Sequence, residues 1–167
     1  MVARSLPEAN QSIIRLSETA AVISIGEPDS ERPYGFDASC ELHYRLEFHD
    51  VINEGQTRLH GGKSVTPPSP EHVERIVELA PTLRAEATFV FVHCNAGISR
   101  STATSLILRC IWLGPGHESF AMDRVVDDRE QAFPNKLMVS YADDILERGG
   151  AMIEAVRAHY EDEGMAF

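Results

Sequence analysis

The sequence predicts an α/β fold in which a central, mostly parallel and twisted sheet is covered by helices on both faces. Strand-like and helix-like runs alternate along the 167 residues, as is typical of this class. Residues 89–92 form a continuous run of aromatic and β-branched residues, as expected for a strand buried on both faces of a parallel sheet. No repeat, low-complexity segment or long linker divides the chain. We therefore expect one domain over residues 1–167, with a core from about 11 to 148.

Local patterns place the other strands and the loops. The predicted strands before residue 89 are Ser12 to Leu16, Ala21 to Ile25 and Glu41 to His49, the last from alternating apolar residues. Glycines and prolines indicate loops over residues 26–40 and 53–68. The second loop is expected to line the rim of a functional site.

Helix signals follow in the second half of the chain. A helix is expected to begin at Ser69-Pro70-Glu71, bury a stripe from Val73 to Ala80, and end at Pro81. Three further helices are predicted: one from Thr102 to a stop at 114–116, one over 119–128, and one capped by Asn135 and stopped by Gly149-Gly150. A C-terminal helix is expected over about 151–160.

Composition limits the classes of function. Fifteen basic against 26 acidic residues give a net charge of −11, which opposes binding to nucleic acid or to an anionic membrane surface. No stretch approaches the roughly 18 apolar residues of a membrane span, and residues 1–11 lack the apolar core of a signal peptide. The three cysteines, Cys40, Cys94 and Cys110, fit a reducing compartment. We therefore expect a cytoplasmic protein, and the sequence leaves its oligomeric state open.

The histidines and cysteines do not predict a metal site. No histidine pair has the i, i+4 spacing with a glutamate that zinc proteases use, and the chain has no Cys-x-x-Cys. We expect neither a metal nor a cofactor.

The strongest functional signal follows the buried strand at 89–92. The chain there reads His93-Cys94-Asn95-Ala96-Gly97-Ile98-Ser99-Arg100-Ser101 and then takes on helical periodicity. The backbone N–H groups of residues 95–100 have no partner in the sheet and lie at the positive end of the helix dipole. They form an anion site before any side chain is counted. Gly97 permits a positive φ and a close approach of the backbone to the anion.

Each side chain of this loop has an expected role. The same N–H groups should stabilise the thiolate of Cys94, which makes it a nucleophile at neutral pH. The planar fork of Arg100 can bind two phosphate oxygens at once. The hydroxyl of Ser101 is expected to donate to the sulfur when it departs from phosphorus. His93 is expected to orient the loop by hydrogen bonding rather than to act as a base.

This loop resembles the signature of the cysteine-dependent protein tyrosine phosphatases, and the length of the chain is similar to that of their compact dual-specificity branch. Ala21 to Gly26 resembles an early central strand of the family, and Pro134-Asn135 resembles an element that follows its signature. Segments similar to small bacterial members, as found in proteobacteria, are Phe48-His49-Asp50-Val51, Pro67-Pro68-Ser69 and His72-Val73. The resemblance covers about residues 11–148.

The resemblance implies a phosphomonoester hydrolase that forms a phosphocysteine without a metal, specifically a protein tyrosine or dual-specificity phosphatase. It also implies a general acid on a loop upstream of the signature, and such a group contributes about 10²- to 10⁴-fold in rate. Asp50, at the end of the predicted strand 41–49, is our interpretation of this acid. Asp37, Glu47 and Glu54 are the alternatives.

Two other functions stay open. One is a phosphoprotein-binding relative that does not hydrolyse its ligand, although the intact Cys94, Arg100 and Ser101 argue against it. The other is a phosphatase for phosphoinositides or small phosphorylated metabolites. It is disfavoured because the family's lipid phosphatases tend to carry lysines in the loop, where this chain has Asn95, Ala96, Ile98 and Ser99.

Two lesser hypotheses concern residues outside the loop. Cys40 could form a regulatory disulfide with Cys94, as some relatives do to protect the catalytic cysteine from oxidation. Arg124, Arg129 and Lys136 follow the signature and are interpreted as solvated charges, with a position at the border of the pocket as the alternative.

Overall fold

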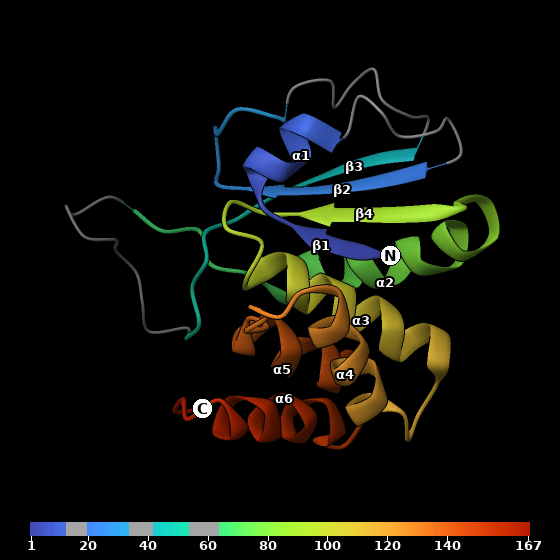
Figure 1. Cartoon of the computed structure of the whole chain (residues 1–167), viewed down its shortest axis with the longest axis vertical. Helices are drawn as coiled ribbons and strands as arrows, with labels where there is room; N and C mark the ends of the chain where they lie inside the picture. The colour runs from blue at the N-terminus through green and yellow to red at the C-terminus, as the bar shows by residue number, and fades with distance from the viewer. Residues whose placement is uncertain (13–19, 34–41, 54–63) are drawn as a thin grey trace.

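The structure is a computed structural model that describes residues 1–12, 20–33, 42–53 and 64–167. Four strands of the described chain form one parallel sheet in the order β1-β4-β2-β3 (Figure 1). Their bounds are β1 Val2–Arg4, β2 Ala20–Gly26, β3 Leu42–Glu47 and β4 Phe89–His93. β4 therefore has a hydrogen-bonded neighbour on each side, which confirms the buried central strand expected from its apolar run.

Helices cover both faces of this sheet, as predicted (Figure 1). On one face, α1 (Leu6–Ser12) packs Ala9 against Val22 and Phe91. The neighbouring strand residues Ile23 and Val92 point to the opposite face and belong to the main core. The helices on that face are α2 Pro70–Glu86, α3 Arg100–Leu113, α4 Glu118–Asp128, α5 Lys136–Ile145 and α6 Ala151–Asp162.

The central helix of the main core is α3. Its residues from Arg100 to Leu108 are all buried, and it contacts α2, α4, α5, β1 and β4. This burial fixes the N-terminus of α3 beyond the carboxyl end of β4. The short connection between the two is the loop that carries Cys94.

The N-terminal segment differs from the prediction. The predicted strand from Ser12 to Leu16 is wrong at Ser12, which is the last residue of α1, and residues 13–16 lie outside the described residues. The helix begins at a capping box, because Ser5 and Glu8 bond reciprocally: the backbone N–H of Ser5 donates to Oε2 of Glu8 at 2.8 Å, and that of Glu8 to Oγ of Ser5 at 3.4 Å. The strand β1 before it was not predicted.

The end predicted for the helix that begins after Ser69 is also wrong. Pro81 removes one backbone donor, yet α2 continues through it to Glu86. Contacts with α3 hold the additional turn: Leu83 is buried, Arg84 donates to the carbonyl of Trp112 at 2.8 Å, and the Trp112 indole donates to the carbonyl of Ala80 at 3.1 Å. Tertiary packing thus overrides the local signal.

The remaining predicted elements agree with the structure within a few residues. Asn135 caps α5, since its side chain accepts from the backbone N–H of Met138 at 3.0 Å. Most of the predicted loops over 26–40 and 53–68 lies outside the described residues. Among the described helices, none combines the length and apolar character needed to cross a membrane.

Candidate active site

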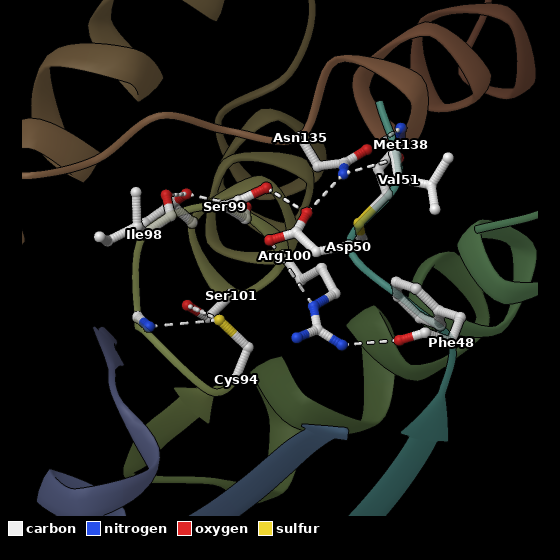
Figure 2. Close-up of polar contacts among 12 residues, drawn as sticks. Phe48, Asp50, Val51, Cys94, Ile98, Ser99, Arg100, Ser101, Asn135 and Met138 are labelled. Atoms are coloured by element: carbon white, nitrogen blue, oxygen red, sulfur yellow. Dashed lines mark hydrogen bonds and ion pairs between the residues drawn. The ribbon is translucent and has the colours of Figure 1, made fainter. Parts of the chain in front are cut away.

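The loop from Cys94 to Ser99 leaves the carboxyl end of the central strand β4 and enters α3 (Figure 2). In open parallel sheets this edge is where ligands bind. Cys94 is 1% exposed and Arg100 is 2% exposed, so both reactive groups are held inside the protein rather than on its surface.

Every backbone carbonyl of this loop accepts a hydrogen bond from a group other than the loop amides. In chain order, the oxygen of Cys94 accepts from His93 Nδ1, and that of Asn95 accepts from the N–H of Leu6. The oxygens of Ala96 and Gly97 both accept from the Arg129 side chain. The oxygen of Ile98 accepts from the N–H of Phe133, and that of Ser99 from the N–H of Asn135. The distances lie between 2.9 and 3.4 Å. The oxygens are thus all fixed by their surroundings.

Fixing the oxygens also fixes the amides. In a trans peptide the C=O of one residue and the N–H of the next point in opposite directions, and the described chain has no cis peptide bond. The N–H groups of residues 95–100 are therefore directed away from the donors that hold the carbonyls. This is the arrangement of amides that the sequence predicted as an anion site.

The sulfur of Cys94 receives two hydrogen-bond contacts within the loop (Figure 2). The N–H of Gly97 donates to Sγ at 3.3 Å, and Oγ of Ser101 lies 3.2 Å from it. Gly97 has φ 72°, and a Cβ there would lie 2.5 Å from backbone atoms of Arg4 and Ser5. Only glycine fits this turn, and the predicted contact between Ser101 and the sulfur is present in the structure.

The guanidinium of Arg100 lies between the cysteine loop and the segment that follows β3. Its Nη1 donates to the carbonyl of Phe48 at 2.6 Å, and its Nε is buried without a hydrogen-bond partner. Nε is also 3.9 Å from Oδ2 of Asp50. A buried cationic donor in this position is suited to a doubly charged oxyanion.

Asp50, the residue interpreted as the general acid, lies beside Arg100 and the cysteine loop. Its Oδ1 accepts from Ser99 Oγ at 2.6 Å and from Asn135 Nδ2 at 2.9 Å, and its side chain is 37% exposed. Glu47, one of the alternatives, forms a partly exposed ion pair with Arg45 at 3.2 Å. The other two alternatives, Asp37 and Glu54, lie outside the described residues.

His93 is held neutral beneath the loop. Burial lowers its pKa to about 4, and the nearby Arg45 and Arg100 act in the same direction. A carbonyl oxygen can only accept, so the 3.4 Å contact with the Cys94 oxygen places the ring proton on Nδ1. The geometry agrees with the predicted orienting role and gives no support to a role as a base.

Two residues of the site were not predicted as part of it. Asn135 was expected only as a helix cap, but its Nδ2 also donates to Asp50 and, at 3.0 Å, to the carbonyl of Val51. Arg129 was interpreted as a solvated charge, with a place at the border of the pocket as the alternative, but its side chain is 17% exposed and bonds to the loop carbonyls. The sequence signal for Asn135 was its place after Pro134, whereas nothing local to Arg129 marks its contact with a loop some 30 positions earlier.

The other two charges and the remaining cysteines have separate surroundings. Arg124 pairs with Asp127 at 3.0 Å on the exposed face of α4, as interpreted, whereas Lys136 donates to the carbonyl of Ala166 at 2.8 Å and lies over the Tyr160 ring.

Cys110 is buried, and burial raises its pKa to about 12. Cys40 lies outside the described residues, so its disulfide with Cys94 stays a prediction. Within the described ranges, no three His, Cys, Asp or Glu side chains gather as metal ligands.

No family model and no curated protein matches the chain. Solved structures do: human DUSP28 is 18% identical and matches over 90% of this chain and 93% of its own, with a TM-score of 0.60. A mouse putative dual specificity phosphatase complexed with zinc tungstate is 15% identical over 89% of this chain and 83% of its own, with a TM-score of 0.58. PTPMT1 in complex with PI(5)P is 17% identical over 92% of this chain and 91% of its own, with a TM-score of 0.57.

The fold is therefore that of the dual-specificity and related protein tyrosine phosphatases, and the likeness extends over nearly the whole chain. This confirms the fold expected from the cysteine signature. The expected likeness to small bacterial members stays a prediction.

Proposed function

We propose that the protein is a phosphomonoester hydrolase that works through a phosphocysteine, and that it is a protein tyrosine or dual-specificity phosphatase. The observation that carries the proposal is the arrangement around Cys94. Its sulfur accepts from the Gly97 N–H at 3.3 Å, and at the same site Nε of the buried Arg100 lies 3.9 Å from Oδ2 of the partly exposed Asp50. The dual-specificity phosphatase fold supports it independently.

The first step transfers the phosphoryl group to sulfur. The thiolate of Cys94 attacks phosphorus, and the bond from phosphorus to the leaving oxygen breaks. Arg100 and the amides of residues 95–100 bind the other phosphate oxygens and stabilise the charge that develops on them. Asp50, in its protonated form, donates its proton to the leaving oxygen.

The second step releases phosphate. Asp50, now a carboxylate, takes a proton from a water molecule that attacks phosphorus, and the bond between phosphorus and sulfur breaks. The departing thiolate regains the Gly97 N–H and accepts from the Ser101 hydroxyl, which lies 3.2 Å from the sulfur. Each proton that Asp50 gives in the first step it recovers in the second.

The test is turnover of p-nitrophenyl phosphate and phenyl phosphate by three variants. Cys94→Ser should abolish both reactions. Asp50→Asn should lower turnover by about 10²- to 10⁴-fold, with the larger loss on phenyl phosphate, because its poorer leaving group depends more on the donated proton. Glu47→Gln is the matched control and should retain activity. Equal losses in the Asp50 and Glu47 variants would mean that the acid is assigned wrongly.

The substrate class needs a separate measurement. PTPMT1, which has the same fold, was solved in complex with PI(5)P, so a phosphoinositide is a second candidate substrate. The loop of this chain presents Asn95, Ala96, Ile98 and Ser99 but no lysine, which favours a phosphoprotein. Comparing kcat/KM for phosphotyrosine peptides, phosphothreonine peptides and phosphoinositides decides between them. Tight phosphopeptide binding without turnover from pH 4 to 8 would instead indicate a binding protein.

A further inference from the structure

Arg129 contacts the cysteine loop on the side of the loop's carbonyl oxygens, opposite to the loop's N–H groups. It follows directly after α4, and its guanidinium donates from Nε to the carbonyl of Gly97 and from Nη2 to the carbonyl of Ala96, both at 3.2 Å. Two adjacent peptide oxygens are thus held by one planar group.

These two contacts determine the direction of two loop amides. The oxygen of Ala96 and the N–H of Gly97 belong to one trans peptide unit, so holding the oxygen outward aims the N–H inward. That N–H is the one that donates to Cys94 Sγ at 3.3 Å. By the same geometry, holding the Gly97 oxygen directs the N–H of Ile98 to the face where phosphate would bind.

Arg129 is itself oriented from the N-terminal helix. Its Nη1 donates to Oε1 of Glu8 at 3.1 Å, and Oε2 of Glu8 accepts from the N–H of Ser5 at 2.8 Å and from its hydroxyl at 2.6 Å. Three separate nitrogens of one guanidinium therefore meet three acceptors. A lysine has its donors on a single atom and cannot reproduce this arrangement.

We propose that Arg129 is a positioning residue for the phosphate loop and that Glu8 holds it in place. This inference rests on the proposed function, because it assigns a role in binding the oxyanion at the same site. Arg129 does not touch the substrate. It acts through the peptide units of Ala96 and Gly97, so its loss weakens oxyanion binding even where the fold is kept.

The experiment compares Arg129→Ala, Arg129→Lys and the control Arg124→Ala, which removes an exposed arginine of α4 that pairs with Asp127 at 3.0 Å. Two readouts are used: inhibition of p-nitrophenyl phosphate turnover by vanadate, and protection of Cys94 from iodoacetate by vanadate. In Arg129→Ala both should need roughly tenfold more vanadate or more, about 1.4 kcal/mol. KM should rise with the inhibition constant, because the misaimed amides bind phosphate before the reaction as well as during it.

Arg129→Lys should lie between the wild type and Arg129→Ala, and Arg124→Ala should match the wild type. Glu8→Gln should shift the vanadate requirement in the same direction by a smaller factor. If Arg129→Ala does not fold, as judged by thermal unfolding, Arg129→Lys and Glu8→Gln still decide. Vanadate requirements equal to that of Arg124→Ala in these variants would overturn the inference. A wild type that neither turns over nor binds vanadate would instead overturn the proposed function.

Discussion

His93 shows how a single buried side chain can shape the loop above it. The ring is 1% exposed, Nδ1 faces the carbonyl of Cys94, and Nε2 has no hydrogen-bond partner. Holding the Cys94 oxygen directs the next N–H, that of Asn95, to the opposite side of the peptide. The neutral ring can do this without adding a charge beneath the sulfur, and burial lowers its pKa to about 4 to keep it neutral.

This burial makes stability depend on pH. The pKa of His93 falls from 6.5 in the unfolded chain to about 4 in the folded protein. Between these values the unfolded chain binds the proton that the folded protein excludes. The contribution of His93 to the free energy of unfolding is therefore fully present above pH 6.5 and is lost as pH falls toward 4. His93→Asn keeps a donor for the Cys94 oxygen and removes the titration. Urea unfolding should show wild type losing about 3 kcal/mol more than this variant between pH 7 and pH 4. Parallel pH profiles of the two proteins would contradict it.

At the scale of elements, Asn135 joins three segments that lie far apart in the sequence. It caps α5 through its Oδ1, holds Asp50 and the carbonyl of Val51 through its Nδ2, and donates its backbone N–H to the carbonyl of Ser99 at 3.2 Å. The cap, the loop of the proposed acid and the cysteine loop thus share one fully buried residue (Figure 2). We therefore expect a change at the start of α5 to affect the position of the proposed acid, Asp50.

Two substitutions separate these roles. Asn135→Ser keeps an acceptor for the start of α5 but has no amide to reach Asp50, whereas Asn135→Ala loses both. Both variants should lose turnover of phenyl phosphate to a similar degree, because both release Asp50. In thermal or urea unfolding the Ser variant should be the more stable by about 1 kcal/mol. Full turnover in Asn135→Ser would show that Asp50 is held without the amide.

The sequence predicts what is local and misses what depends on distant contacts. Cys94 and Arg100 lie at the two ends of one short connection, between a buried strand and the first residue of α3, so their proposed roles could be predicted from spacing in the sequence. Arg129 gains its role only because α4 ends behind that loop, and α2 passes Pro81 only because α3 holds its last turn. The first helix is a different case, since Ser5 and Glu8 have the spacing of a capping box, a local signal in the sequence that marks its start.

At the scale of the whole molecule, the charge of the protein opposes the charge of its site. The chain carries a net charge of −11, whereas the proposed phosphate site offers Arg100 and a set of inward amides. The field of the whole protein acts over a distance set by ionic strength, about 30 Å at 0.01 M and 10 Å at 0.1 M salt. The contacts within the site act at a few ångströms and change little. Varying the salt concentration therefore changes how fast a charged substrate approaches the protein while leaving its contacts within the site nearly unchanged.

The choice of substrate should accordingly depend on salt. A phosphopeptide flanked by acidic residues is repelled by the surface at low salt, so its kcat/KM should rise several-fold between about 0.01 M and 0.15 M sodium chloride. A peptide with the same phosphorylated residue flanked by lysines should show the opposite trend, since salt weakens its attraction. p-Nitrophenyl phosphate serves as the reference for effects on the chemical step. Steady-state rates for the three substrates over this range are the measurement, and identical salt dependence for the two peptides would mean that the acidic surface does not control access to the site.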